Sequence, residues 1–299
     1  LVNGNPDVKT FDKNRTFRTP RIPQIPSGAI HLPGTKDKLS ELGPEKFAAW
    51  IKNEKPVYFT DTTLRDAHQS LLATRVRTTD MMKVVRNFAI MHPQVFSMEV
   101  WGGATFDVAL RFLHECPWKR LQLIREAVPN ILLQMLIRGS NAIGYAAYPD
   151  NLVVKFIEKS WDNGVDIFRI FDSLNWTKSM KVSVNAVRDY TGGIAQACIC
   201  YTGDLQDKRK TKYNLNYYID LAGELERMGA HMLGIKDMAG LLKPYAAVEL
   251  IEALQKTVKI PIHLHTHDTS SIQPATYIKA VEAGVDVIDV ALGSLSGLT

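Results

Sequence analysis

Short apolar runs rich in β-branched and aromatic residues recur along the chain and alternate with longer segments that are apolar at helical spacing. The runs have the length of buried strands, and the clearest of the longer segments end in glycine, as the carboxyl terminus of a helix prefers. The predicted strands are residues 57–62, 96–101, 131–137, 166–172, 195–201, 231–236, 262–267 and 285–292. The clearest intervening helices are predicted at residues 151–164, 215–229 and 274–284.

The alternation of strand and helix predicts an α/β fold with a parallel sheet, and eight such units predict closure into a (β/α)8 TIM barrel. We expect this barrel over residues 57–299. The eighth strand ends close to Thr299, so the eighth helix and any carboxyl-terminal extension are expected to be missing from this chain.

The residues before the barrel have a different composition. Residues 1–36 are rich in proline and glycine without sustained periodicity, which predicts an extended linker or arm from a preceding domain. Residues 37–56 are predicted to form a helical lead-in, read as one helix over about residues 38–55.

Composition narrows the class of protein. The 299 residues are 45% apolar and 22% charged, enough for a large core. The net charge is +5, but the basic residues are dispersed and the one dense run, residues 208–212, is typical of a solvated loop, so no nucleic-acid partner is expected. No stretch reaches the roughly 18 apolar residues of a membrane span, and no targeting segment is recognisable. Three cysteines without metal-ligand spacing are typical of a reduced intracellular protein.

The seventh predicted strand carries a row of histidines. In IHLHTHDT, the two-residue period of a strand places His263, His265 and His267 on one face. His265 and His267 are nearest the mouth of the barrel and have the spacing of a pair of ligands for zinc, manganese or cobalt. His263 lies deeper, and we expect it to be structural.

The first predicted strand ends in TDTTLRDAHQS, a short polar loop over the same mouth. A carboxylate from this loop would complete a metal site with the histidines. Spacing alone does not separate Asp61 from Asp66, and either is compatible with an ordinary turn cap or a pair with Arg65. His68 and Gln69 belong to the same loop.

The sixth strand ends in GIKDMAG and places Lys236 at the mouth. A lysine beside a cation is unusual, because burial and a nearby metal both lower the pKa of an amine. A neutral amine would serve as a base, a Schiff-base nucleophile or an acceptor of carbon dioxide. The alternative is a lysine that forms an ion pair with Asp237.

Two further strand ends carry polar residues. After the third strand, Arg138 offers a guanidinium suited to a carboxylate substrate, with a surface ion pair as the alternative. The second strand ends in EVWGGATFD, with Glu99, Trp101 and Asp107 beside a glycine pair that allows close backbone approach. Two adjacent glycines do not make a phosphate-binding loop.

These segments together resemble the carboxyltransferase domain of the pyruvate carboxylase family over about residues 57–299. The resemblance lies in TDTTLRDAHQSLLATRVRT, FSMEVWGGATFDVALRFLHECPW, YTGD followed by RKTKY, GIKDMAGLLKP and HLHTHDT. The arm before them resembles the stretch that joins the biotin carboxylase domain to this barrel. The resemblance implies a divalent metal (Zn, Mn or Co) bound by Asp66, Lys236, His265 and His267, with Lys236 carried as a carbamate derived from carbon dioxide.

The resemblance also implies a substrate site and a biotin site. In it, Arg65, Gln69 and Arg138 hold and polarise the 2-oxo acid, while Asp107 and Tyr145 lie at the pocket that the biotin ring enters. The implied reaction passes a carboxyl group from carboxybiotin to the enolate of pyruvate and gives oxaloacetate.

The implied partners are the biotin carboxyl carrier and biotin carboxylase domains of a homotetramer, in the bacterial cytoplasm or the mitochondrial matrix. One departure from the family pattern is HTHDTSS, which has Ser271 where glycine is common.

Three other functions remain open. The barrel is also compatible with carboxyl transfer to another 2-oxo acid, including the alpha subunit of an oxaloacetate decarboxylase. A second alternative is a non-catalytic scaffold that docks a biotin carrier. A third is a metal-dependent aldol-type lyase or synthase, which shares TLRD and the HxH pattern but has no carbamate ligand at the position of Lys236.

Overall fold

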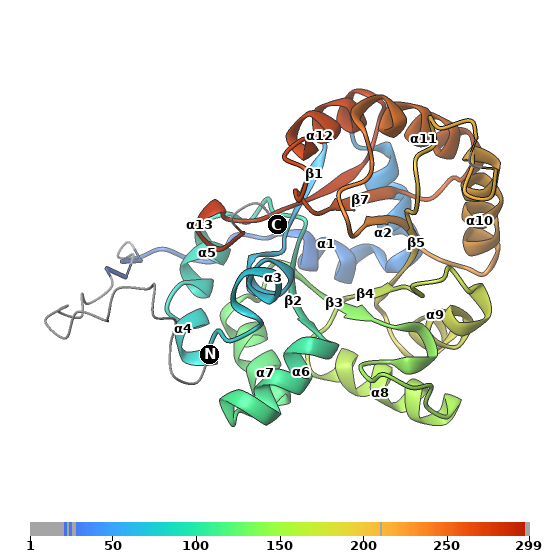
Figure 1. Cartoon of the computed structure of the whole chain (residues 1–299). Coiled ribbons are helices and arrows are strands. Elements are labelled where there is room, and N and C mark those ends of the chain that lie inside the picture. The colour runs from blue at the N-terminus through green and yellow to red at the C-terminus, as the bar shows by residue number, and fades with distance from the viewer. Residues whose placement is uncertain (1–20, 23, 26–27, 210, 297–299) are drawn as a thin grey trace, which may run out of the picture.

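The structure, a computed structural model, describes residues 21–296 except residues 23, 26, 27 and 210. Eight parallel strands close into a barrel in chain order, and the pairing of Tyr58 with Val287 joins the first strand to the last (Figure 1). The strands are β1 (Tyr58–Asp61), β2 (Ser97–Gly102), β3 (Leu132–Ile137), β4 (Ile167–Ile170), β5 (Ile194–Cys200), β6 (Met232–Asp237), β7 (Ile262–Thr266) and β8 (Val287–Val290). The predicted TIM barrel is therefore confirmed.

Helices surround the barrel and bury one apolar face each. Between the strands, the helices of seven or more residues are α5 (Val85–Met91), α7 (Pro117–Ala127), α8 (Asp150–Asp162), α9 (Thr177–Tyr190), α10 (Leu215–Arg227), α11 (Pro244–Thr257) and α12 (Gln273–Glu282). The three helices predicted most clearly correspond to α8, α10 and α12. In α8, Val153 and Ile157 are buried, as the helical spacing of apolar residues requires.

Shorter segments connect these elements at the mouth of the barrel. They are α3 (His68–Leu72), α4 (Thr78–Met81), α6 (Gly103–Val108), α13 (Gly293–Ser296) and π-helical turns at Thr63–Ala67 and Ala109–Leu113, with a 3-10 turn at Gly139–Asn141. After β8 the described residues contain one short helix, α13. None of the helices described here is long and apolar enough to cross a membrane.

The segment before the barrel differs from the single helix expected over residues 38–55. It forms two helices, α1 (Thr35–Leu42) and α2 (Pro44–Asn53), because Gly43 takes a left-handed φ of 73° and Pro44 opens a new helix. Most of the expected arm, residues 1–20, lies outside the described residues. The carboxyl-terminal end of the arm is bonded to the barrel, since Asn130 Nδ2 donates a hydrogen bond to the Leu32 carbonyl oxygen at 2.8 Å.

Helices α1 and α2 cover the amino-terminal end of the barrel. Leu39, Phe47 and Ile51 are almost fully buried there. They form one apolar cluster with residues at the starts of the strands: Phe96, Leu132, Ile167, Ile194, Met232 and Val287. Burying each such side chain contributes about 1.5–3 kcal/mol. The lead-in is thus an apolar cap of the barrel.

Candidate active site

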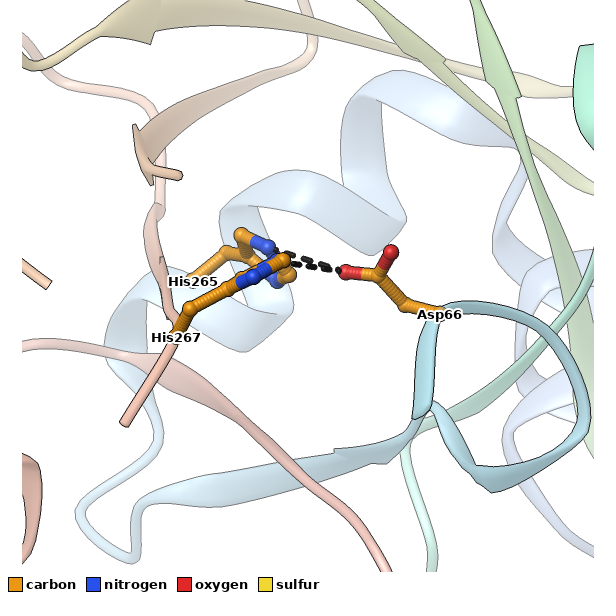
Figure 2. A group of neighbouring side chains, drawn as sticks. All are labelled: Asp66, His265 and His267. Carbon is orange, nitrogen blue, oxygen red and sulfur yellow. Dashed lines mark hydrogen bonds and ion pairs between the residues drawn. The ribbon is translucent and has the colours of Figure 1, made fainter. Parts of the chain in front are cut away.

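Asp66, His265 and His267 come together at the carboxyl-terminal mouth of the barrel. His265 lies on β7, His267 follows that strand directly, and Asp66 lies in the π-helical turn after β1. Asp66 Oδ2 is 3.1 Å from Nε2 of each histidine, as Figure 2 shows. One potential ligand atom from each residue lies within 4.8 Å of the other two. Three of the four residues expected to bind the metal therefore form one group.

Electrostatics keep Asp66 in the form that binds a cation. Burial alone would raise the pKa of the Asp66 carboxyl, but the Arg65 guanidinium and the imidazoles of His265 and His267 beside it hold that pKa well below its usual range. Arg65 Nη1 lies 3.0 Å from Asp66 Oδ1. The other oxygen, Oδ2, faces the histidines.

The structure distinguishes the two aspartates that spacing left open. Asp61 Oδ1 accepts a hydrogen bond from Thr63 Oγ1 at 2.5 Å and takes no part in the histidine group. Burial raises the pKa of Asp61 to about 6. His68 also stays apart: its Nε2 lies 2.7 Å from the Leu64 carbonyl oxygen, and burial lowers its pKa to about 4.

The donor set fits a divalent cation. His265 Nε2 is buried and makes no hydrogen bond, although it faces Asp66. A buried ring nitrogen without a partner is costly unless something else takes its lone pair. Two imidazoles and a carboxylate suit zinc, manganese or cobalt.

Lys236 lies beside this group on the neighbouring strand. It is 4% exposed, and its register partner on β7 is His265. Within the described part of the chain its Nζ has no hydrogen-bond partner and lies 5.7 Å from the centroid of the Phe171 ring. The alternative ion pair with Asp237 is absent there, because consecutive strand residues face opposite sides and Asp237 accepts hydrogen bonds from Leu241 and Leu242.

Arg65 and Gln69, both expected to hold the substrate, are joined to each other. Arg65 Nη1 donates to Gln69 Oε1 at 3.2 Å. Arg65 is 2% exposed, and its Nε and Nη2 donate to Glu99 Oε2 at 2.7 and 2.5 Å. The guanidinium is therefore held in one orientation next to Asp66.

Arg138 lies half-buried after β3, at the rim of the same mouth. Its Nη1 donates to the Gly144 carbonyl at 3.0 Å, and its guanidinium stacks 5.0 Å from the centroid of the Tyr145 ring. It forms no ion pair with another described residue, unlike the surface pair considered from the sequence. Its charge is thus available to an anionic ligand.

The two glycines at the end of β2 differ in how closely the backbone is approached. A Cβ at Gly103 would clash with the Ile143 carbonyl oxygen at 2.8 Å, whereas one at Gly102 would make only ordinary contacts, such as 3.5 Å to Arg65 Cδ. Gly103 therefore allows the close backbone approach expected from the sequence, and Gly102 is not required for it.

Asp107 and Tyr145, expected at the biotin pocket, lie on the segments that follow β2 and β3. Asp107 Oδ1 pairs with Arg111 Nε at 2.7 Å, and Tyr145 is 77% exposed. Neither contacts the histidine group. A cavity of about 240 Å³ is lined by Asp66, His265 and His267 together with residues that include Gln273 and Tyr277.

Two buried charged residues behind the histidines are not foreseen by the sequence reasoning. Asp289 on β8 lies with Oδ2 2.6 Å from His265 Nδ1 and Oδ1 2.6 Å from His263 Nε2. Arg169 on β4 lies with Nη1 2.5 Å from Asp289 Oδ2. The available signal is a charged residue within an otherwise apolar strand, IFRI or VIDV. His263, fully buried, has the structural place expected for it.

The buried charges form a closed ring around the mouth. Arg169 Nη1 also approaches Glu99 Oε1 at 3.4 Å, which links it back to Arg65. The members of the ring, each in contact with the next, are Arg65, Glu99, Arg169, Asp289, His265 and Asp66. Three carboxylates face two guanidiniums, an excess of one formal negative charge that favours a cation.

Comparisons with known proteins agree with this geometry. Residues 154–298 match the HMGL-like family model. The chain is 57% identical over 298 residues to pyruvate carboxylase of Bacillus subtilis and 52% identical over 300 residues to the human mitochondrial enzyme. Each match covers all of this chain but 26% and 25% of the relative, so the chain spans about a quarter of their length.

Solved structures give the same result. The carboxyl transferase domain of Rhizobium etli pyruvate carboxylase with pyruvate and biocytin matches at 52% identity, with a TM-score of 0.91 over 94% of this chain and 46% of that one. The same domain with pyruvate matches with a TM-score of 0.93, over 99% of this chain and 50% of that one. The chain therefore belongs with the carboxyltransferase region of the pyruvate carboxylase family.

Proposed function

We propose that this chain transfers a carboxyl group from carboxybiotin to the enolate of pyruvate and so forms oxaloacetate. The observation that carries the proposal is the convergence of Asp66, His265 and His267 beside the arginines at the barrel mouth. Relatives named pyruvate carboxylase, and a related domain solved with pyruvate and biocytin, support the choice of substrates.

A divalent cation would be held by Asp66, His265, His267 and Lys236. Bound there, it would supply Lewis-acid stabilisation of negative charge on the keto oxygen of the substrate. Carbon dioxide added to the neutral Lys236 amine, with loss of one proton, would make that side chain an anionic oxygen ligand. Among the residues that the structure describes, none forms a hydrogen bond with Lys236 Nζ, and this supports an amine that is open to that reaction.

The remaining residues bind and orient the reactants. Arg138 would pair with the substrate carboxylate, because its guanidinium has no competing carboxylate among the described residues. Arg65, fixed by Glu99, would direct a donor at the developing oxyanion together with Gln69. Asp107 and Tyr145 would contact the biotin ring.

The wider assignments follow from the same proposal. We infer that the chain works with biotin carboxyl carrier and biotin carboxylase domains in a homotetramer. The compartment would be the bacterial cytoplasm or the mitochondrial matrix, as for the bacterial and mitochondrial relatives.

The test replaces Lys236 with alanine in the full-length protein. We expect Lys236→Ala to lose bound metal and to lower oxaloacetate formation from pyruvate by at least about 100-fold, with unchanged circular dichroism. Elemental analysis measures the metal, and mass spectrometry of the parent tests for one carbon dioxide on Lys236. The control is Lys259→Ala, an exposed lysine at the opposite end of the barrel, which should behave like the parent.

Three results would contradict the proposal. Full transfer activity in Lys236→Ala would remove this residue from the site. A parent protein that contains metal but forms no oxaloacetate, and instead cleaves or condenses an acyl-CoA, would favour an aldol-type enzyme. A parent without metal or activity would favour a docking scaffold.

A further inference from the structure

The two ring nitrogens of His265 have different surroundings. Nε2 faces Asp66 and makes no hydrogen bond, whereas Nδ1 lies 2.6 Å from Asp289 Oδ2. Because Arg169 contacts both oxygens of Asp289, at 2.5 and 3.1 Å, this group is a carboxylate that can only accept. Nδ1 of His265 must then carry a hydrogen, so in the neutral imidazole that binds a metal the lone pair lies on Nε2.

Asp289 is itself held rigidly. It is 4% exposed, and His263 Nε2 lies 2.6 Å from its Oδ1. Arg169, which reaches it from β4 across the barrel, donates through Nε to Gln196 Oε1 at 2.7 Å. The carboxylate therefore has one position, set by residues from three other strands.

His267 lacks such support. Its Nε2 lies 3.1 Å from Asp66 Oδ2, and no residue in the described part of the chain bonds to its Nδ1. It is half-buried and follows the end of β7, so its ring is less constrained than that of His265. The two imidazoles thus differ. The surroundings of His265 fix its tautomer, whereas those of His267 do not.

We propose that Asp289 is a positioning residue that, clamped by Arg169, fixes the tautomer and ring orientation of His265 so that Nε2 faces the cation. Histidine ligands in metal sites commonly donate their other N–H to a carboxylate, and loss of that partner weakens metal binding. The inference rests on the proposed metal site, and it assigns to β4 and β8 a role in forming that site.

The test measures cobalt(II) binding to full-length protein that has been stripped of metal. The dissociation constant comes from competition with a chelator, and the visible absorption of bound cobalt reports the ligand geometry. We expect Asp289→Asn to weaken binding by about 10- to 100-fold and to change the spectrum, since an amide does not hold one tautomer.

The matched control is Asp166→Asn. Asp166 is equally buried and also pairs with two cations, Lys36 and Arg125, both at 2.6 Å, but it lies at the start of β4, at the opposite end of the barrel. A general loss of stability would appear in both variants, whereas weaker cobalt binding with an altered spectrum should appear only in Asp289→Asn.

A second variant covers the case in which Asp289→Asn does not fold, because it leaves Arg169 buried without its partner. The double variant Asp289→Asn, Arg169→Gln removes both charges and should keep the fold while still binding cobalt weakly. If Asp289→Asn and the double variant bind cobalt with the parent's affinity and spectrum, Asp289 does not position His265, while the proposed metal site is unaffected. A parent protein that binds no cobalt would overturn the metal site and this inference together.

Discussion

The two ends of the barrel bury different kinds of side chain. At the amino end, α1 and α2 pack Leu39, Phe47 and Ile51 against the starts of the strands. At the carboxyl end, the interior holds a ring of ion pairs and a histidine nitrogen without a hydrogen bond. Apolar burial contributes about 25 cal/mol per Å², whereas a buried ion pair often adds nothing over apolar residues of the same volume. The comparison indicates that the amino end provides stability and the carboxyl end holds charges in place for chemistry.

The largest expected effect is at the amino end. Phe47→Ala should lower the free energy of unfolding by about 3–5 kcal/mol, because Phe47 is fully buried in the apolar cap. Urea unfolding followed by tryptophan fluorescence measures the loss. Phe59→Ala, at a phenylalanine that is 45% exposed, is the control and should cost much less. If Phe47→Ala also weakened cobalt binding, the two ends would not be independent.

The second effect is a pH dependence at the mouth. Burial raises the pKa of Asp61 to about 6 from an ordinary value of 3.8. Between these values the folded state keeps a proton that the unfolded state has lost, so this group's contribution to stability falls as pH rises from about 4 to 6. The total change is about 3 kcal/mol.

Asp61→Asn should lack this pH-dependent loss of stability. The difference in the free energy of unfolding between Asp61→Asn and the parent should therefore shift in favour of the variant as pH rises from about 4 to 6. The control is Asp80→Asn on the surface. Hydrogen bonds from Arg77 and Lys83 lower the pKa of Asp80 to about 2, so this variant should show no such slope above about pH 4. Parallel pH profiles for Asp61→Asn and the parent would argue against a protonated Asp61.

A third prediction separates activity from stability at the mouth. Arg138→Ala should lower kcat/KM for pyruvate by about 100-fold, because the substrate carboxylate loses a charged hydrogen-bond partner. Its melting temperature should change little, since Arg138 is half-buried and donates to one carbonyl, that of Gly144. Arg209→Ala, at an exposed arginine, should leave both quantities unchanged. Unaltered kinetics in Arg138→Ala would exclude this arginine from substrate binding.

The smallest expected effect concerns the loop after β7. Ser271 has a φ of 57°, the left-handed region that glycine enters without steric cost. Ser271→Gly should therefore raise the free energy of unfolding by about 0.5–1 kcal/mol, measured by urea unfolding. Ser270→Gly in the same loop should not stabilise, because Ser270 donates a hydrogen bond to the Gly240 carbonyl.

Much of the fold could be read from the sequence, because the barrel depends on local periodicity that each strand and helix shows separately. The break at Gly43 was harder to foresee, since it depends on a backbone φ that the apolar pattern of α1 and α2 does not report. At Ser271, where the sequence departs from the family's common glycine, the structure has a left-handed φ that the departure alone did not predict.

The candidate site, like the fold, was predicted from the sequence only in part. Histidines at two-residue spacing indicate one face, and the structure brings His265 and His267 together. Spacing could not separate Asp61 from Asp66, because only the π-helical turn after β1 decides which carboxylate faces the histidines. Asp289 was missed because its contact with Arg169 on β4 crosses the barrel, and distance along the chain carries no information about such a contact.

The ring of buried groups around the mouth is closed. Each member, from Arg65 through Asp289 to Asp66, contacts two others, so a change at one position removes one contact from each of two neighbours. Single substitutions there should be rare among related proteins, and replacements should come in compensating pairs. The six residues of the ring would then have evolved as one unit, even though they come from five different segments of the chain.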